Sequence, residues 1–390
     1  CKDEKRKQEL LGIAANCRVV PENPPQTFWQ ALQMIWFAHV YFHIEVCTTA
    51  NGYGRFDQYM WPYYKKDVID EKNITQEEAM EMLECLYLKS CEVYEVRDKW
   101  YATSFAGYPM WEILLVGGQT PDGKDATNEL SYLCLEAANQ LKTVMGVRVW
   151  EGTPEDLIRK GCEMIQDGQA NPGFFNDDVA MKMTLGKGCT MEEARDWTIV
   201  GCIQPGPGGG STDGSPDAGY VNMGKMLEFV LHNGVDPSTG KLMGLQTGDP
   251  RDFKNIDDLK DALKKQILHH YKLVATGYKV MQSMHMTRFP VIFAGMVTKG
   301  CVESGKSVQH GGAKYTTAGM YVTGAANLAD SIVAIEKCVF EDKDITMDEL
   351  ITAIDKNFEG EERMRQLLLN KPAKFGNDDE HVDGVYKEMM

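Results

Sequence analysis

The most informative part of this sequence is the stretch Val200-Gly201-Cys202-Ile203-Gln204-Pro205. The residues that follow, 206–211, contain four glycines and a proline, too many for a helix or a strand to form there. The residues before it, Trp197–Val200, are mostly apolar and predict a buried strand. Cys202 is therefore expected at the tip of a loop that leaves a buried strand. Such a thiol is either the reactive sulfur of an enzyme or a buried free cysteine, and the loop alone leaves both open.

Composition excludes several classes of protein. The 390 residues carry a formal net charge of −16, which disfavours nucleic acid and anionic membranes as partners. The eleven cysteines are scattered without a CxxC pair, so we expect free thiols in a reducing cytoplasm rather than disulfides, zinc or iron–sulfur sites. No signal peptide is apparent, and the longest apolar run, Phe28–Ile44, is interrupted by Gln30, Gln33, His39 and His43 and falls short of a membrane span.

Helix and strand signals alternate along the chain. Thr27, Thr75, Thr190 and Thr346 are each followed three residues later by Gln or Glu, which predicts a capping box at four helix starts. Thr153-Pro154 predicts a fifth start, with proline at the first helical position. Apolar runs at 111–116, 144–150, 197–200 and 291–293 predict short strands. This alternation predicts an α/β fold with strands covered on both sides, in one domain that contains the glycine-rich loop.

Several polar or glycine-rich clusters favour local structure over a ligand site. Residues 117–129 lack both phosphate-loop patterns and predict a turn followed by a helix cap. Asn176-Asp177-Asp178 also predicts a turn with a helix cap. His39 and His43 share a helical face, but no third ligand is obvious in the sequence, so we predict no metal site. Gly311-Gly312 and Gly324-Ala325-Ala326 suggest close backbone packing, with a site wall as an alternative.

Taken in order, these segments resemble the glycyl radical enzyme family, also called pyruvate formate-lyase-like enzymes. Nearly the whole chain is covered by the motifs, which are Trp29–Tyr64 with Gly54-Arg55-Phe56-Asp57-Gln58-Tyr59, Phe105–Pro109, Val116–Ala137, Val200–Pro205, Asn222–Gly234, Ser307–Ile335 and Lys374–Asp379. The resemblance rests on the order in which these motifs follow one another along the chain.

The resemblance implies a ten-stranded α/β barrel made of two half-barrels. It implies that Cys202 carries a thiyl radical, which abstracts a hydrogen atom from a small-molecule substrate. It implies a homodimer and a partner, an activating enzyme that uses S-adenosylmethionine and an iron–sulfur cluster to place a radical on a glycine. That glycine lies in an Arg-Val-x-Gly-Tyr context that this chain does not contain. We therefore expect residues 1–390 to be an internal piece that lacks an N-terminal region and the glycine radical domain, binds no cofactor itself and is inactive alone.

Three positions bear on the substrate. Where diol, glycerol, choline and hydroxyproline members have Glu two residues after the cysteine, this chain has Gln204, whose amide cannot act as a base. Thr49-Ala50 stand where glycerol-type dehydratases have a His-Ser pair, and Asp217 matches their substrate-binding Asp with a one-residue gap. We therefore predict Gln204, Asp217 and Thr49 as substrate-binding residues beside the catalytic Cys202.

These departures leave several activities open. The predicted function is radical cleavage of a C–C or C–X bond in a small organic acid or alcohol. Alternatives are formate acetyltransferase, which the single cysteine disfavours, arylacetate decarboxylase, and addition of a hydrocarbon to fumarate, for which no arginine follows between Cys202 and Asn222. An alternative of another class is a non-catalytic product of a split or decayed gene. An in-frame Arg-Val-x-Gly-Tyr downstream would discriminate the enzyme from the non-catalytic piece.

Overall fold

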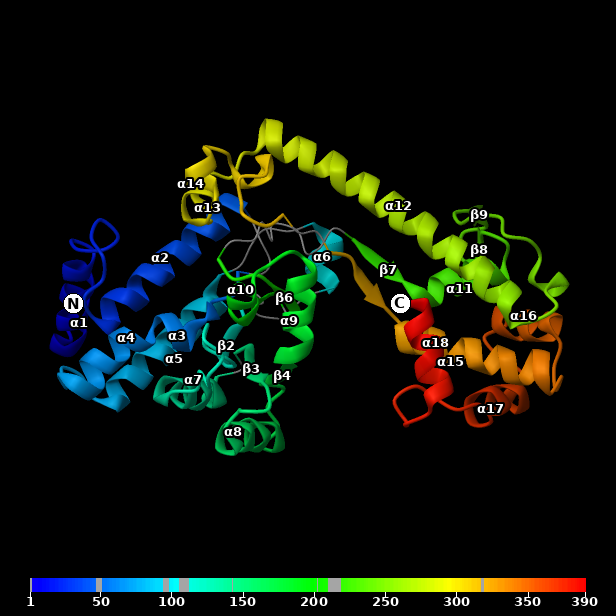
Figure 1. Cartoon of the computed structure of the whole chain (residues 1–390), viewed down its shortest axis with the longest axis horizontal. Coiled ribbons are helices and arrows are strands. Elements are labelled where there is room, and N and C mark those ends of the chain that lie inside the picture. Colours follow the sequence, from blue (N-terminus) through cyan, green and yellow to red (C-terminus); the bar gives the residue numbers. More distant parts are fainter. Residues whose placement is uncertain are drawn as a thin grey trace. The chain divides into compact units, whose positions relative to one another are not determined.

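The chain folds into two compact units (Figure 1). The computed structural model describes residues 2–46, 51–93, 98–104, 112–141, 143–201, 203–209, 219–316 and 319–390. The first unit contains Cys1–Gly214 and Arg288–Thr317, and the second contains Ser215–Thr287 and Ala318–Met390. The sequence led us to expect one domain, whereas the contacts within the chain separate into these two units. That residues 1–390 are a partial family domain stays a prediction.

A four-stranded parallel sheet in the order β1-β2-β3-β4 forms the centre of the first unit. Its strands are β1 (Gly54–Arg55), β2 (Leu114–Gly117), β3 (Met145–Val149) and β4 (Gly173–Asn176). The predicted runs at 111–116 and 144–150 are thus confirmed as strands with shifted ends. Every residue of β2 is buried, as expected for a parallel strand covered on both faces.

Helices connect and cover these strands. Figure 1 shows α7 and α8, the helices that follow β2 and β3, beside the sheet. The helices of the first unit are α1 (Glu4–Asn16), α2 (Phe28–Val46), α3 (Phe56–Tyr59), α4 (Trp61–Tyr64), the π-helix η1 (Lys65–Asp70), α5 (Gln76–Glu92), α6 (Lys99–Ser104), α7 (Glu129–Gln140), α8 (Glu155–Gln166), α9 (Asp177–Gly186), α10 (Met191–Arg195), α13 (Ile292–Val297), α14 (Cys301–Ser304) and the 3₁₀ turn η3 (Val308–His310). The α/β class is confirmed. The ten-stranded barrel stays a prediction, because the described residues show only this sheet and three separate strand pairs.

The core of the first unit lies between the sheet and α2, α5 and α7. Phe28, Leu83, Leu130 and Val147 are among its fully buried side chains. Asp57, which is also fully buried, accepts hydrogen bonds from the backbone N–H of Gly117 and the hydroxyl of Ser131. It thereby joins the Gly54–Tyr59 motif to β2 and to the start of α7.

Capping residues begin the helices largely as the sequence predicts. Reciprocal capping boxes are present at Thr75, Thr190 and Thr346. At Thr27 only half of the box forms, because the Gln30 side chain accepts from the N–H of Gln26 instead. Pro154 is the N-cap of α8 rather than its first helical residue.

The predicted strand at 291–293 is wrong, because these residues begin helix α13. The carboxylate of Glu45, at the end of α2, accepts hydrogen bonds from the backbone N–H groups of Ile292, Phe293 and Ala294, at 2.6, 2.8 and 3.1 Å. Free N–H groups at a helix start favour a negative charge, so this distant carboxylate stabilises the helix. An apolar run therefore becomes a helix through a contact far along the chain.

The second unit is mostly helical, with one parallel strand pair. Tyr321–Thr323 (β10) pairs with Tyr220–Asn222 (β7). Its other elements are α11 (Met223–Leu231), the hairpin β8 (Val235–Asp236) and β9 (Lys241–Leu242), the 3₁₀ turn η2 (Pro250–Asp252), α12 (Ile256–Arg288), α15 (Ala325–Ile335), the π-helix η4 (Glu336–Glu341), α16 (Met347–Asp355), α17 (Glu362–Asn370) and α18 (Glu380–Met389). α11, α12, α15, α16 and α18 contribute buried side chains to its core.

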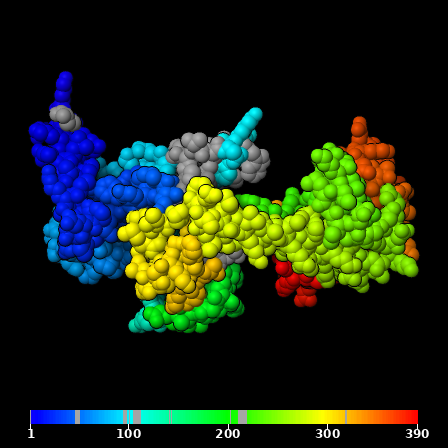
Figure 2. Space-filling model, turned by 90° about the horizontal axis from the view of Figure 1, so that it is seen from above, coloured from blue at the N-terminus to red at the C-terminus, as the bar shows by residue number. Residues whose placement is uncertain are grey.

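Helix α12 is buried only in its first half. Leu259, Leu263 and Ile267 enter the core, whereas Val280 and Met284 are exposed. Figure 2 shows this second half, in yellow-green to yellow, at the surface of the visible face. Among the helices of the described residues, none has both the length and the apolar character needed to cross a bilayer.

Candidate active site at the cysteine loop

The loop that carries Cys202 connects the two strands of a short antiparallel hairpin. β5 (Thr198–Val200) pairs with β6 (Gln204–Gly206), and Val200 lies opposite Gln204. The predicted strand at 197–200 is thus confirmed, whereas Gly206, which the sequence placed in the glycine-rich loop, is the last residue of strand β6. Gly201 has a φ of +67°, a conformation that favours glycine, so the residue before the cysteine turns the chain. Cys202 itself lies outside the described residues, and its role stays a prediction.

A buried ion pair from the parallel sheet holds the start of this hairpin. The guanidinium of Arg148, on β3, binds both carboxylate oxygens of Asp177 at 2.7 and 3.0 Å, and both side chains are fully buried. The same guanidinium donates to the backbone carbonyls of Arg195 and Trp197 at 2.8 and 3.1 Å. Because both carbonyls closely precede β5, Arg148 fixes the entry of the cysteine hairpin relative to the sheet.

Trp197 completes this support. Its indole N–H donates to Asp177 at 2.9 Å, and the guanidinium of Arg148 lies 4.5 Å from its ring centroid. Burial and the nearby Arg55 lower the pKa of Arg148, while Asp177 opposes them. A buried charge that is paired through planar donors is a rigid support for the residues that it holds.

A second arginine, on β1 of the same sheet, also binds the residues that precede the hairpin. Arg55 donates to the Arg195 carbonyl and to Asp196 at 3.2 and 3.1 Å, and to the carbonyls of Gly117 and Gln119 at 3.4 and 2.7 Å. Arg55 belongs to the Gly54–Tyr59 motif. That motif is therefore joined by direct hydrogen bonds to the residues that lead into the cysteine hairpin.

The pairing of Arg148 with Asp177 was not predicted from the sequence. A signal was present, because an arginine within the apolar run 144–150 needs a buried acid as partner. Nothing in the sequence identified Asp177 rather than Asp178 as that acid; the helix cap predicted there is confirmed, with Asn176 as the N-cap of α9. The turn and cap predicted at 117–129 are likewise confirmed, with Asn128 as the N-cap of α7.

Gly118 makes room for the guanidinium. Its φ is +82°, and a Cβ there would lie 2.4 Å from Nε of Arg148. A side chain at this position is therefore incompatible with Arg148 in its observed place.

Gln204 is the one predicted substrate-binding residue that the structure describes. Its Oε1 is buried and has no hydrogen-bond partner among the described residues. A buried amide oxygen without a donor costs about 1–3 kcal/mol, so this atom is available to accept from a ligand. Thr49 and Asp217 lie outside the described residues, and their roles stay predictions.

The segment around α14 packs against the end of the glycine-rich loop. The Lys299 N–H donates to the Gly209 carbonyl at 3.1 Å, and the Lys314 N–H donates to the Lys299 carbonyl at 3.1 Å. The close backbone packing predicted at Gly311-Gly312 is confirmed, since a Cβ on Gly312 would lie 2.1 Å from the Lys306 carbonyl oxygen. The side chains of Lys314 and Tyr315 both hydrogen-bond Glu193 on α10.

We expect Glu193→Gln to remove part of the acid sensitivity of the first unit. Hydrogen bonds from Lys314 and Tyr315 lower the pKa of Glu193 from 4.5 to about 2. A carboxylate with a lowered folded-state pKa stabilises the fold above pH 4.5, and this stabilisation is lost as pH falls toward 2. Because the pair is partly exposed, the effect is about 1 kcal/mol or less. Urea unfolding at about pH 7 and about pH 3 measures it; Glu192→Gln is the control, and an unchanged pH slope in Glu193→Gln would contradict the assignment.

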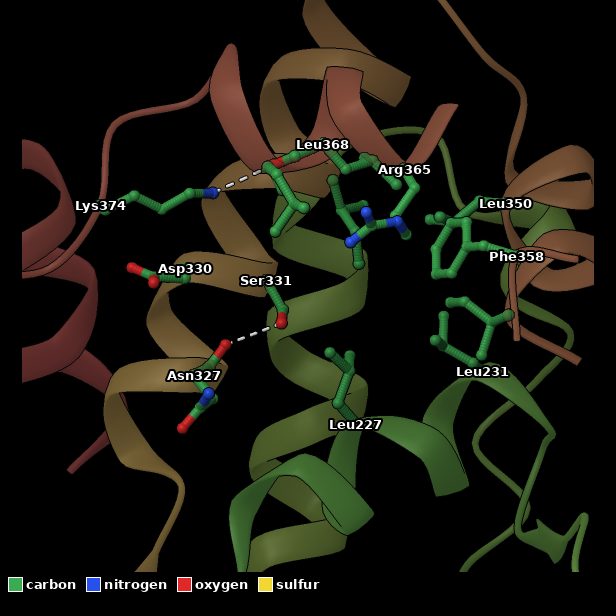
Figure 3. A pocket seen from close by; sticks show the side chains of 14 residues that line it. Leu227, Leu231, Asn327, Asp330, Ser331, Leu350, Phe358, Arg365, Leu368 and Lys374 are labelled. Carbon is green, nitrogen blue, oxygen red and sulfur yellow. Dashed lines mark hydrogen bonds between the residues drawn. The ribbon is translucent and has the colours of Figure 1, made fainter. Parts of the chain in front are cut away.

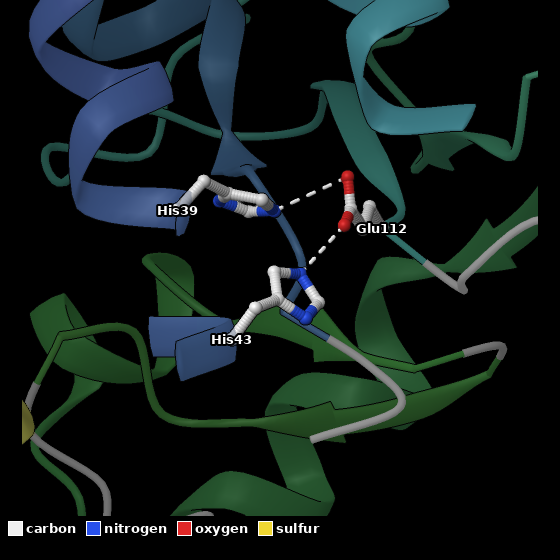
Figure 4. Close-up of side chains that lie close together, drawn as sticks. All are labelled: His39, His43 and Glu112. Atoms are coloured by element: carbon white, nitrogen blue, oxygen red, sulfur yellow. Dashed lines mark hydrogen bonds and ion pairs between the residues drawn. The ribbon is translucent and has the colours of Figure 1, made fainter. Parts of the chain in front are cut away.

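His39 and His43 have a third neighbour that the sequence did not reveal. Glu112, just before β2, lies within 2.7 Å of His43 and 3.3 Å of His39 (Figure 4). The expectation that no third potential ligand is near them is therefore corrected. The eight cysteines that the structure places among the described residues are free, as predicted.

A pocket of about 390 Å³ lies in the second unit and contains none of the predicted site residues. Figure 3 shows mainly apolar side chains around it, such as Leu227, Leu350 and Phe358, with Arg365 at its wall. Its polar groups are partly engaged with the backbone: Ser331 donates to the Asn327 carbonyl and Lys374 to the Leu368 carbonyl. It offers no group suited to radical chemistry.

Comparison with known proteins identifies the family. The profile of the pyruvate formate lyase-like family matches residues 1–390. The chain is 34% identical to a trans-4-hydroxy-L-proline dehydratase of Clostridioides difficile and 33% identical to an isethionate sulfite-lyase of Nitratidesulfovibrio vulgaris. These alignments cover 100% and 99% of this chain but 49% and 47% of the relatives. The glycerol-bound B12-independent glycerol dehydratase of Clostridium butyricum superposes with a TM-score of 0.91 at 35% identity, over 100% of this chain and 49% of that one.

The chain belongs to the pyruvate formate lyase-like family, and the resemblance to glycyl radical enzymes is confirmed. It spans about half the length of the curated relatives it matches.

Proposed function

We propose that this chain supplies the cysteine-loop part of a glycyl radical enzyme that cleaves a C–O or C–S bond of a small organic molecule. The observation that carries the proposal is the end-to-end match of the chain, at about one-third identity, to relatives named dehydratase and sulfite-lyase. The hairpin geometry supports it, since a loop fixed by Arg148 and Arg55 suits a residue that must be held against one substrate C–H bond.

In this proposal Cys202 acts as a thiyl radical. The sulfur radical takes a hydrogen atom from a substrate carbon, which gives a thiol and a carbon-centred radical. The neighbouring C–O or C–S bond then breaks with its electron pair on the leaving group. The hydroxyl on the radical carbon gives up its proton, which the leaving group takes up as it departs as water or hydrogen sulfite. The product radical, now beside a carbonyl, takes the hydrogen atom back from the thiol. Atoms and electrons balance without an added oxidant, because the radical returns to Cys202.

In this proposal Gln204 binds the substrate through a hydrogen bond and does not take a proton from it. Its buried Oε1 can accept a hydrogen bond from a substrate hydroxyl, but an amide does not take up a proton. We propose Asp217 and Thr49 as the other polar contacts. We further propose that an activating enzyme installs the radical on a glycine, and that the enzyme is a homodimer.

A substrate panel tests the reaction class. The whole protein is activated anaerobically and assayed with glycerol, propane-1,2-diol, trans-4-hydroxyproline, isethionate and an arylacetate. We expect turnover of a hydroxylated or sulfonated compound. Release of CO2 from the arylacetate alone would instead establish decarboxylation, and no turnover despite a measured glycyl radical would contradict the proposal.

On the substrate identified in this way, Gln204→Ala is expected to lower kcat/KM by about 10-fold. This is the size of effect expected from one lost neutral hydrogen bond of about 1–1.5 kcal/mol. Ile203→Ala, which truncates an exposed neighbour in the same loop, is the control. Equal effects of the two variants would remove Gln204 from substrate binding.

A further inference from the structure

Two histidines and a glutamate meet inside the first unit, apart from the residues that support the cysteine hairpin. His39 and His43 lie one turn apart on α2, and Figure 4 shows both imidazoles turned toward Glu112. The side chains of His39, His43 and Glu112 are 7%, 5% and 2% exposed. Each carboxylate oxygen faces a different ring: Oε1 lies 2.7 Å from Nε2 of His43, and Oε2 lies 3.3 Å from Nε2 of His39.

The two halves of this cluster are not equivalent. The contact between Glu112 and His43 is a hydrogen bond. On the other side, His39 Nε2 and Glu112 Oε2 are both buried and have no hydrogen-bond partner among the described residues, although they face each other. The two atoms form an ion-pair contact at 3.3 Å that lacks hydrogen-bond geometry, so an ion between them would satisfy both better than they satisfy each other.

We propose that His39, His43 and Glu112 bind a divalent transition-metal ion, and that zinc is the ion they suit best. Their ligand atoms all lie within 4.8 Å of one another. Two imidazole nitrogens and one carboxylate oxygen form a donor set that binds zinc with one position open. Metal–ligand bonds of about 2.0–2.2 Å place tetrahedral ligand atoms roughly 3.3 Å apart. The His39–Glu112 distance already meets this value, and the shorter His43–Glu112 contact opens by roughly half an ångström to reach it.

The surroundings fix the orientation of one ligand. The ring of Tyr53 stacks on His39 with centroids 4.2 Å apart and an angle of 8° between the planes. The Tyr53 hydroxyl and the Ser90 hydroxyl share a hydrogen bond of 2.6 Å, and Ser90 also donates to the Leu86 carbonyl. An imidazole held in this way loses little freedom when it binds a metal.

An ion bound here would link helix α2 to the segment that precedes β2. Its ligands come from α2 and from the segment that leads into β2, while Tyr53 directly precedes β1. The proposal does not depend on the radical chemistry, because none of these residues is assigned a part in it.

Zinc binding to the purified whole protein tests the proposal. After dialysis against a chelator, the protein is titrated with Zn²⁺ in competition with a chromophoric chelator. We expect one more zinc ion per chain in the native protein than in Glu112→Gln or His43→Ala, with a loss of affinity of about 10–100-fold or more in each variant. His381→Ala, which removes an exposed imidazole in the second unit, is the control and should bind as the native protein does.

Two further measurements distinguish zinc at this site from zinc on free thiols and from misfolding of the variant. Because thiols also bind zinc, Co²⁺ is added in place of Zn²⁺, and the native-minus-Glu112→Gln spectrum should show d–d bands without thiolate charge transfer. Zn²⁺ should also raise the Tm of the native protein and not that of Glu112→Gln, whose own unfolding transition shows that the variant is folded. Equal zinc content and equal Tm shifts in both proteins would overturn the proposal and leave only an ion-paired His–Glu–His cluster.

Discussion

Cys202→Ala is expected to abolish turnover in the activated enzyme while the glycyl radical signal is retained. On the proposed mechanism, the sulfur of Cys202 is the atom of this chain that exchanges a hydrogen atom with the substrate, and alanine offers no S–H bond to replace it. A loss on the order of 10⁴-fold or more is typical of removing a covalent catalytic group. Product formation is measured under anaerobic conditions, and the radical by electron paramagnetic resonance.

Cys162→Ala provides the matched control. It removes an exposed thiol on α8, and both turnover and radical content should equal those of the native enzyme. Substantial turnover by Cys202→Ala would exclude a thiyl radical at this position. Loss of turnover together with loss of the glycyl radical would indicate failed activation, and Cys202→Ser, the closest replacement in size, should then be compared.

Asp177→Asn is expected to destabilise the first unit by about 3–5 kcal/mol, the cost of leaving one member of a buried ion pair without its counter-charge. The guanidinium of Arg148 would stay buried against a neutral amide, and the indole N–H of Trp197 would lose a charged acceptor. Because Arg148 also holds the carbonyls that precede β5, we expect weakened order in the cysteine hairpin as well. Urea unfolding followed by near-ultraviolet circular dichroism measures the change.

Asp178→Asn is the control for this variant. Asp178 is the adjacent residue in the same first turn of α9 but is exposed, so the shift should stay within about 0.5 kcal/mol. The double variant Arg148→Met with Asp177→Leu should recover much of the lost stability, since apolar replacement of a buried pair is often neutral. If Asp177→Asn lowers the free energy of unfolding by less than about 1 kcal/mol, the ion pair does not stabilise the first unit as expected.

Local signals in the sequence predicted the helix starts and most strands. Three threonine capping boxes form as predicted because both partners lie within one turn. The prediction for 291–293 failed because the conformation of this run depends on Glu45, which lies 247 residues before Ile292 in the chain. No window of neighbouring residues contains that information.

The candidate site was predictable to a similar degree. The apolar run before Cys202 and the glycine-rich residues after it were enough to predict a loop there, because the signals for both lie in neighbouring residues. Glu112 could not be paired with His39 and His43 from sequence, since it approaches them only once α2 lies beside the sheet. Arg148 could have been singled out as a buried charge, but its partner could not.

Gly118 and Arg148 restrict which residues each position can accept. No side chain is tolerated at position 118 while the guanidinium occupies its place 2.4 Å from the would-be Cβ. Replacing Arg148 first would free that space, but it would leave the buried carboxylate of Asp177 without its counter-charge. Any single replacement among these three residues is therefore expected to destabilise the first unit, whereas a paired replacement can avoid both the overlap and the unpaired charge.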